Sequence, residues 1–255
     1  MIDKRMKNYD NLKGGLYGLL IGDALGVPYE FHDAEEIPPY EEIEMTPPAG
    51  FQRAHVGVEA GTWSDDGAQA LCLLDSIVTC GKFCLKDFSD RLLAWYQEGK
   101  WAVDLDAHNQ CLITHRNLCN QVCCALYCLV ARALLTGLDF DAALRKALCY
   151  LRNIYSEMPE YEQELEWSIR PDERWEGKGS GYVVDCLRSA FMIMNCAAGY
   201  EDAVKRAIML GDDTDTTACV TGGLAGICFG FSDIPERWRG VLRGTADVDI
   251  LWERA

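Results

Sequence analysis

Basic side chains and histidines are scarce in this sequence. The 255 residues contain 24 Lys or Arg and four His against 40 Asp or Glu, which gives a formal net charge of -16 at pH 7. A surface this acidic repels phosphate backbones and anionic lipid headgroups, so neither nucleic acid nor a membrane surface is an expected partner. An anionic ligand would need local help from a metal, a helix N-terminus or an arginine.

Unbroken apolar runs of membrane-spanning length and fixed-period repeats are absent as well, and alternating strand patterns are nearly absent. Apolar residues recur instead with helical spacing, which predicts an all-α fold. Proline is tolerated in the first turn of a helix, so Pro235 is expected to open a last helix that runs toward Leu242. The other predicted helices cover residues 16–25, 68–78, 88–96, 118–135, 142–151, 182–198, 203–210 and 217–229.

Zinc-type spacing is also missing, although the chain has 13 cysteines. The Cys80/Cys84 and Cys119/Cys123 pairs have no histidine in register, so a zinc site is not expected. Eleven cysteines lie in apolar, helix-periodic stretches, and the polar residues 1–13 do not resemble a signal peptide. These features favour buried free thiols in a reducing compartment, hence a cytoplasmic protein.

Two stretches interrupt the helical pattern. Residues 30–50 carry seven acids and no Lys or Arg, and residues 156–181 are acidic and end in a glycine-rich run. Both are predicted to be loops, either rims of a functional site or simply solvated surface.

The first chemical cluster is Ser64, Asp65 and Asp66, directly before a buried helix. A hydroxyl and two carboxylates offer the hard oxygen ligands that magnesium, manganese and calcium prefer. Ordinary helix capping explains the same residues, because Ser and Asp are good N-caps and acids suit the first helical turn. This cluster alone leaves both readings open.

The second cluster, Asp213, Asp215 and Thr216, also precedes an apolar helix. Its carboxylates repel one another unless a cation or strong hydrogen bonds offset the repulsion. About 150 positions separate the two clusters. If the two helix starts meet, six oxygens converge in a pocket that is costly without metal and natural for two divalent ions.

Three further features accompany the clusters. Glu30 has aromatic neighbours in sequence, and burial would make it a candidate general base or metal-gating ligand; a surface glutamate is the alternative. His115 precedes a long helix, where either an anion-binding or a structural role fits. The run Gly179, Ser180, Gly181 and Tyr182 could present backbone N–H groups to a phosphate.

Together these pieces resemble the ADP-ribosylglycohydrolase family. The resemblance covers residues 15–31, 61–75, 112–137 and 179–255, and its specific feature is the Gly-Asp-Asp-Thr-Asp-Thr run paired with a distant Ser-Asp-Asp. It implies one domain over residues 1–255, an orthogonal helix bundle with two Mg²⁺ or Mn²⁺ ions in a central cleft. The implied metal ligands are Ser64, Asp65, Asp66, Asp213, Asp215 and Thr216.

The resemblance also assigns the remaining roles. Glu30 matches a mobile family glutamate near the metals, with Glu30 or Asp66 as the catalytic proton acceptor, and His115 and Tyr182 match residues of the ADP-ribose cleft. Ser64 replaces the usual threonine, and Asp212 replaces a common glycine. The family's Gly-Asn-Gly-(Ser/Ala)-x-Met-Arg phosphate loop is missing from this sequence.

The implied activity is metal-dependent hydrolysis of the bond between ADP-ribose and a protein side chain or small acceptor, by a monomer. Two alternatives follow from the missing loop. One is a catalytically impaired ADP-ribose-binding, metal-binding or crystallin-like structural protein. The other is a hydrolase of a smaller ribosyl substrate.

Overall fold

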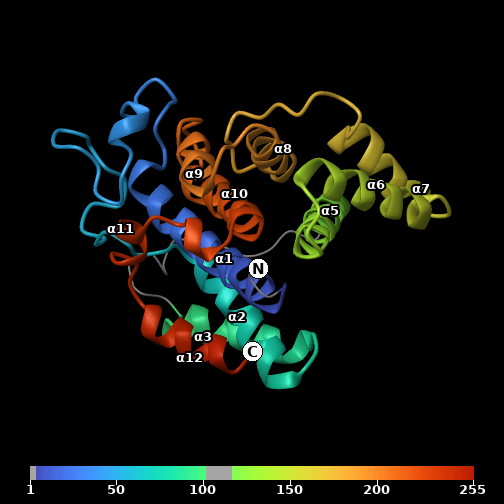
Figure 1. The fold of residues 1–255 in the computed structure, drawn as a ribbon, viewed down its shortest axis with the longest axis horizontal. Coiled ribbons are helices and arrows are strands. Elements are labelled where there is room, and N and C mark those ends of the chain that lie inside the picture. The colour runs from blue at the N-terminus through green and yellow to red at the C-terminus, as the bar shows by residue number, and fades with distance from the viewer. Residues whose placement is uncertain (1–3, 102–116) are drawn as a thin grey trace.

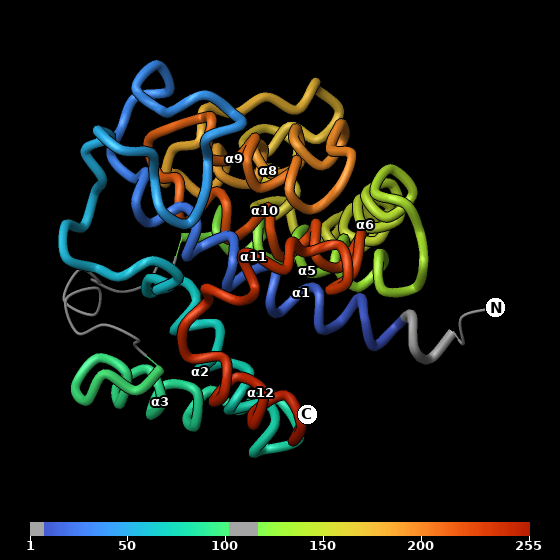
Figure 2. The backbone as a smooth tube through the Cα atoms, turned by 60° about the vertical axis from the view of Figure 1, so that its left-hand side comes forward, coloured from blue at the N-terminus to red at the C-terminus, as the bar shows by residue number. Residues whose placement is uncertain are grey.

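The computed structural model describes residues 4–101 and 117–255, and within them all regular structure is helical. The long helix α1 (Lys4–Gly26) crosses the middle of the molecule beside α10 (Thr214–Phe229), as Figures 1 and 2 both show. Below this pair lie α2 (Asp65–Cys80), α3 (Leu85–Glu98) and α12 (Thr245–Glu253). Above it lie α8 (Val183–Met194) and α9 (Tyr200–Ile208).

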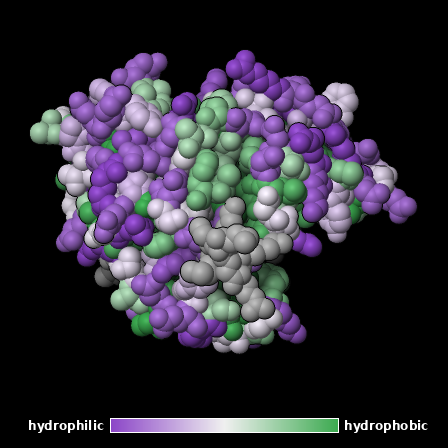
Figure 3. All heavy atoms as spheres, in the orientation of Figure 1, coloured by the Kyte–Doolittle hydropathy of each residue, from purple (hydrophilic) through white to green (hydrophobic). Residues whose placement is uncertain are grey.

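The remaining helices form an extension on one side and short connections. The extension contains α5 (Leu118–Leu135), α6 (Phe140–Tyr155), α7 (Pro159–Gln163) and the π-helical turn η3 (Glu164–Ile169). The connections contain η1 (Val27–Tyr29), η2 (Tyr40–Glu42), η4 (Phe231–Asp233) and α11 (Glu236–Arg239). Apolar side chains gather over the α8–α10 region on the face drawn in Figure 3, whereas hydrophilic ones cover the outer loops.

Helices α1 and α10 pack with their backbones in direct contact. Gly14, Gly18, Gly22 and Gly26 recur every fourth residue and therefore share one face of α1. A Cβ atom on any of them would approach the backbone of α10, or of the residues just after it, to less than 3.0 Å. The small residues predicted to allow close approach between helices do so here, and they bring the C-terminal end of α1 against the start of α10.

The predicted all-α class is confirmed, and each predicted helix outside the C-terminal region has a counterpart. Two expectations were wrong in detail. The segment 156–181 was predicted to be a loop, but α7 and η3 occupy residues 159–169, with Pro159 at an allowed first-turn position. The helix after Pro235 ends at Arg239, and the separate α12 follows it. Whether 1–255 is a single domain stays a prediction.

The cysteines are all free in the described residues, as expected, but fewer are buried than predicted. Helical periodicity places a residue on one side of a helix but does not show whether another element covers that side. The exposed thiols are those of Cys124, Cys128, Cys149 and Cys196. Cys111 lies outside the described residues.

Helix α5 also corrects the statement that the chain holds no span-length apolar segment. Leu118–Leu135 is long and apolar enough to cross a membrane by length and composition, although only 39% of it is buried inside the molecule. The expectation considered unbroken apolar runs, whereas this helix includes Asn120, Gln121 and Arg132. Because core helices of other folds pass the same test and α5 packs against α6 and α8, the finding is weak evidence for a membrane.

Candidate active site

The start of α2 is fastened to α1 by a buried carboxylate. Asp23 is fully buried, and its oxygens accept hydrogen bonds from the backbone amides of Ser64 (2.8 Å) and Gly67 (2.7 Å). The Ser64 hydroxyl caps the same helix end by accepting from the amide of Asp66 at 3.3 Å. The predicted capping role of Ser64 is therefore real, and α1 supplies a second cap from outside the helix.

The start of α10 is held by the loop after α1 and by the glycine-rich run. The Asp212 amide donates to the carbonyl of His32 (2.7 Å), and the Phe31 amide donates to the carbonyl of Asp212 (2.8 Å). The Asp213 amide donates to the carbonyl of Gly179 (3.0 Å). Asp212 adopts φ of 60°, a left-handed conformation that suits glycine and that Asp tolerates better than most residues. This conformation explains why an Asp can stand where the family often has glycine.

The two acid-rich helix starts meet. The Thr216 hydroxyl donates to the Asp66 carboxylate at 2.8 Å, across 150 positions of sequence. Carboxylate oxygens of Glu30, Asp213 and Asp215 lie within 4.8 Å of one another. The convergence on which the sequence argument depended is therefore present, and it includes Glu30, the residue directly after η1.

Burial and mutual repulsion disfavour the charged form of several of these carboxyl groups. The pKa of Asp66 rises to about 7, chiefly through desolvation, then through the charge of Asp65 and, further down, those of Asp213 and Glu30. The pKa of Asp215 rises well above its usual value for the same first reason, and next because of Glu30 and Asp23. The pKa of Asp23 also rises well above normal, through burial and then the charge of Asp66.

Nearby thiols do not change the character of the site. Burial, followed by the charges of the acid cluster, raises the pKa of the Cys186 and Cys219 thiols far above neutrality. Both thiols stay protonated and are poor metal ligands. The available donors are therefore carboxylate and hydroxyl oxygens, the set that Mg²⁺ and Mn²⁺ prefer, and a cation among them would relieve the repulsion. The residues present thus fit the divalent metals that the resemblance implies.

The predicted metal ligands differ in how closely their oxygen atoms approach one another. Asp213 and Asp215 belong to the compact group, and Asp66 and Thr216 are joined by their hydrogen bond. The Asp65 carboxylate accepts from the Gln69 side chain at 3.2 Å, within its own helix. Ligation by all six residues stays a prediction.

The side chain of Glu30 is held by His55, which lies in the segment between η2 and α2. Its carboxylate lies 2.5 Å from the imidazole Nε2 of His55, and both side chains are largely buried. The His55 ring also packs against Phe31, with ring centroids 5.6 Å apart. The alternative reading of Glu30 as a surface residue of an acidic loop is therefore wrong, because its side chain points into the cluster.

The glycine-rich run lies against the start of α10, and two of its backbone amides donate hydrogen bonds to side chains of α8. The Gly179 amide donates to the Ser189 hydroxyl (3.1 Å), and the Ser180 amide donates to the Asp185 carboxylate (2.8 Å). A Cβ atom on Gly181 would collide with the Asp213 carboxylate, so this backbone passes directly over a predicted ligand. The Gly179 and Ser180 amides thus already have acceptors within the protein, and a phosphate-binding role for the run stays a prediction.

Two residues complete the comparison with the sequence. Tyr182 is the N-cap residue of α8 and is 62% exposed, so its ring is accessible to a ligand. His115 lies outside the described residues. Asp23 was missed as a site residue. The available signal was an acid inside an apolar helical run that was itself predicted to be buried.

Comparisons with known proteins show which family the chain resembles. A family model described as ADP-ribosylglycohydrolase matches residues 4–108 and 100–255. The ADP-ribosylarginine hydrolase Tri1 of Pseudomonas putida (strain GB-1) is 28% identical over 289 residues, which covers 90% of this chain and 73% of the relative. The ADP-ribosyl-[dinitrogen reductase] glycohydrolase of Rhodospirillum rubrum is 21% identical, with 95% and 93% covered.

A solved structure shares the fold. It is described as an ADP-ribosylglycohydrolase-related protein complex, and it superposes with a TM-score of 0.65 at 24% sequence identity, covering 98% of each chain.

Proposed function

Since the chain belongs to the ADP-ribosylglycohydrolase family, we propose that it is a divalent-metal-dependent hydrolase of ADP-ribosylated protein side chains or small ADP-ribose conjugates. The observation that carries the proposal is the meeting of two remote acid-rich helix starts, marked by the Thr216–Asp66 hydrogen bond, beside the Glu30, Asp213 and Asp215 group. Family membership alone supports hydrolysis of ADP-ribose linkages; the metal dependence is the part that the acid cluster adds.

Asp213 and Asp215, with Asp66 and Thr216 beside them, are the residues proposed to hold the cations. When bound, two divalent ions would act as Lewis acids toward ribose and water oxygens. The proposed reaction breaks the bond between the anomeric carbon C1″ of the ribose and the acceptor atom, and the oxygen of a water takes the acceptor's place. The released acceptor leaves with a proton, so the water supplies OH to the sugar and H to the acceptor.

Glu30 is the preferred proton acceptor for that water. It is a carboxylate within the acid group, and His55 fixes its orientation at 2.5 Å. Asp66 is the alternative, since a carboxyl pKa of about 7 suits proton transfer at neutral pH. A cation bound beside Asp66 would lower that pKa again and favour a ligand role instead. We therefore assign the base to Glu30 and metal binding to Asp66.

Arginine is the first acceptor to test, because two relatives, from Pseudomonas putida and Serratia proteamaculans, are named ADP-ribosylarginine hydrolases. The assay incubates purified protein with an ADP-ribosylarginine peptide and, separately, an ADP-ribosylserine peptide, and measures free ADP-ribose. We expect release with Mg²⁺ or Mn²⁺ and none with a chelator. Asp213→Asn should abolish release, whereas Asp141→Asn, an exposed acid in the first turn of α6, should not.

Two results would contradict the proposal. Release that persists undiminished in chelator would remove the metal dependence. Tight ADP-ribose binding by calorimetry with no release from either peptide would leave a binding module in place of an enzyme.

A further inference from the structure

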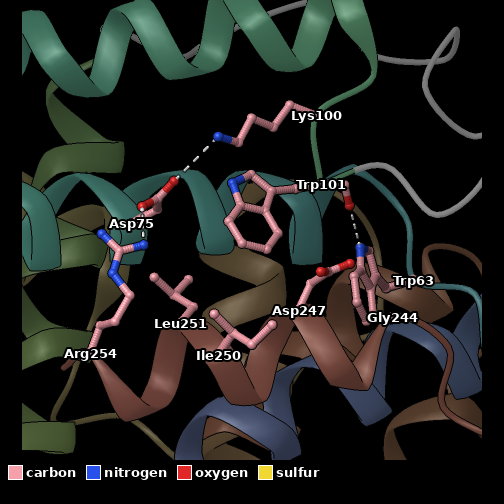
Figure 4. Close-up of a pocket in the computed structure, with 9 residues that line it drawn as sticks. All are labelled: Trp63, Asp75, Lys100, Trp101, Gly244, Asp247, Ile250, Leu251 and Arg254. Atoms are coloured by element: carbon pink, nitrogen blue, oxygen red, sulfur yellow. Dashed lines mark hydrogen bonds and ion pairs between the residues drawn. The ribbon is translucent and has the colours of Figure 1, made fainter.

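A cavity of about 540 Å³ lies between α2, α12 and the residues that follow α3 (Figure 4). It is separate from the acid cluster. Asp75 in its wall is nine residues beyond Asp66 on α2, which is two and a half helical turns and places the two side chains on opposite faces of that helix. The volume is in the range of small-molecule sites.

One end of the cavity has a surplus of positive charge. Asp75 is 4% exposed and is hydrogen-bonded by the guanidinium of Arg91, which also binds Asp87 at 2.6 Å. Lys100 Nζ and Arg254 Nη1 each lie 3.7 Å from the Asp75 carboxylate, close enough for an ion pair but too long for a hydrogen bond.

Lys100 and Arg254 are held by Asp75 only through these long ion pairs, so both can also bind another anion. Their side chains are about half exposed, and Figure 4 shows both reaching toward Asp75 from different sides of the cavity. Arg254 also donates a hydrogen bond from Nη2 to the Thr79 hydroxyl at 3.4 Å. In a protein of net charge -16, this end of the cavity is a place where an anionic group can bind without a metal.

The middle of the cavity is aromatic and apolar. The indole of Trp101 projects into it above Ile250 and Leu251 (Figure 4). The Trp101 carbonyl accepts from the indole N–H of Trp63 at 2.9 Å, which fixes the backbone from which the ring projects. The Trp101 indole N–H itself is buried and has no acceptor among the residues that the structure describes. A ligand that enters the cavity could supply an acceptor for this donor.

The opposite end carries a carboxylate. Asp247, Ile250 and Leu251 share one face of α12, and Arg254, its C-cap residue, continues the i, i+3, i+4, i+7 pattern on that face. Asp247 and Arg254 are seven residues apart, or about 10 Å along the helix axis, the length scale of a single nucleotide. The cavity therefore offers a cationic end, an indole face and an acidic end in that order.

We propose that this cavity binds a nucleoside monophosphate whose base carries an exocyclic amino group. The phosphate lies at Lys100 and Arg254, the base stacks on Trp101, and the amino group donates to Asp247. The Trp101 N–H donates to an oxygen of the ligand. The cavity contains none of the residues of the acid cluster, so this proposal does not depend on the proposed hydrolase activity.

Calorimetry on the full chain with adenosine monophosphate, in chelator, tests the proposal. We expect binding to the wild type, about a tenfold weaker affinity for Lys100→Gln, and no change for Lys82→Gln, which removes the same charge from an exposed turn. Inosine monophosphate, which lacks the amino group, and inorganic phosphate should bind more weakly. Asp213→Asn should retain full binding even though it abolishes the proposed hydrolysis.

Several outcomes would overturn the proposal. They are the absence of binding at millimolar ligand, equal binding by the Lys100 and Lys82 variants, and inorganic phosphate binding as tightly as the nucleotide. Loss of binding in Asp213→Asn would place the nucleotide at the acid cluster instead. Circular dichroism of each variant checks that the fold is intact.

Discussion

Replacing Asp66 with Asn should stabilise the metal-free protein at high pH. Folding raises the pKa of this carboxyl group from 3.8 to about 7, so the folded state binds the proton more tightly than the unfolded chain. Stability from a raised carboxyl pKa is present below the unfolded value and is lost as the pH rises toward the folded value. Asn carries no charge, keeps an oxygen that can accept from Thr216, and does not titrate.

The size of the effect follows from the shift. Each pKa unit corresponds to about 1.4 kcal/mol, so the cost of charging Asp66 is about 2 kcal/mol at pH 5.5 and about 4 kcal/mol at pH 8.5. These are upper figures, because Asp66 keeps some solvent contact and neighbouring acids share the repulsion. The advantage of Asp66→Asn over the wild type should therefore grow by up to about 2 kcal/mol between these two pH values.

The assay is urea unfolding followed by tryptophan fluorescence, in chelator, at pH 5.5, 7.0 and 8.5. Asp141→Asn is the matched control, because Asp141 is also the second residue of its helix but is exposed. It reports the loss of a helix-dipole interaction alone, for which a few tenths of a kcal/mol of destabilisation is expected. An Asp66→Asn protein no more stable than wild type at pH 8.5, or an advantage independent of pH, would refute the electrostatic reasoning.

Three further predictions concern the scaffold. Gly22→Ala should destabilise by about 2 kcal/mol or more, because its Cβ would collide with the Ala218 carbonyl. Gly240→Ala should cost less, because the nearest atom to its Cβ is the Glu236 carbonyl oxygen at 3.3 Å, which needs only a small shift; thermal melting compares the two. Asp212→Gly should range from neutral to about 1 kcal/mol more stable in urea, since φ of 60° suits glycine; a clear loss of stability would contradict this. Arg188→Met should cost about 3 kcal/mol, because the buried guanidinium binds carbonyls of Ile169, Arg170, Arg174 and Glu176 that would lose their donors; a loss below 1 kcal/mol would argue against that role.

The helices were predictable because periodicity and small residues act locally. The run 118–135 was predicted with its observed bounds, and the pattern at 217–229 matched all but the first turn of α10. The short α7 and η3 were not predicted, because an acidic segment with two prolines is typical of a loop and only tertiary packing favours a helix there. Helix α12, which follows Gly244, was not predicted; the last predicted helix ran only from Pro235 toward Leu242.

The acid cluster was predictable in part, since repelling acids at two helix starts indicate a shared cation. The role of Asp23 was not, because only the three-dimensional fold places its carboxylate under the amides of Ser64 and Gly67. The local sequence likewise left Glu30 undecided, and its contact with His55 settled the direction of its side chain.

The glycine face of α1 determines how precisely the acid cluster can be built. Where side chains separate two helices, a substitution can be absorbed by a change of rotamer, and the helices drift slightly as homologues diverge. Here the separation between α1 and α10 is set by main-chain atoms in contact, which have no rotamers to exchange. The spacing between Asp23 and the first turn of α10 is therefore held to a narrow tolerance that sequence change elsewhere in the core can hardly alter, at the expense of admitting almost no other residue at four positions.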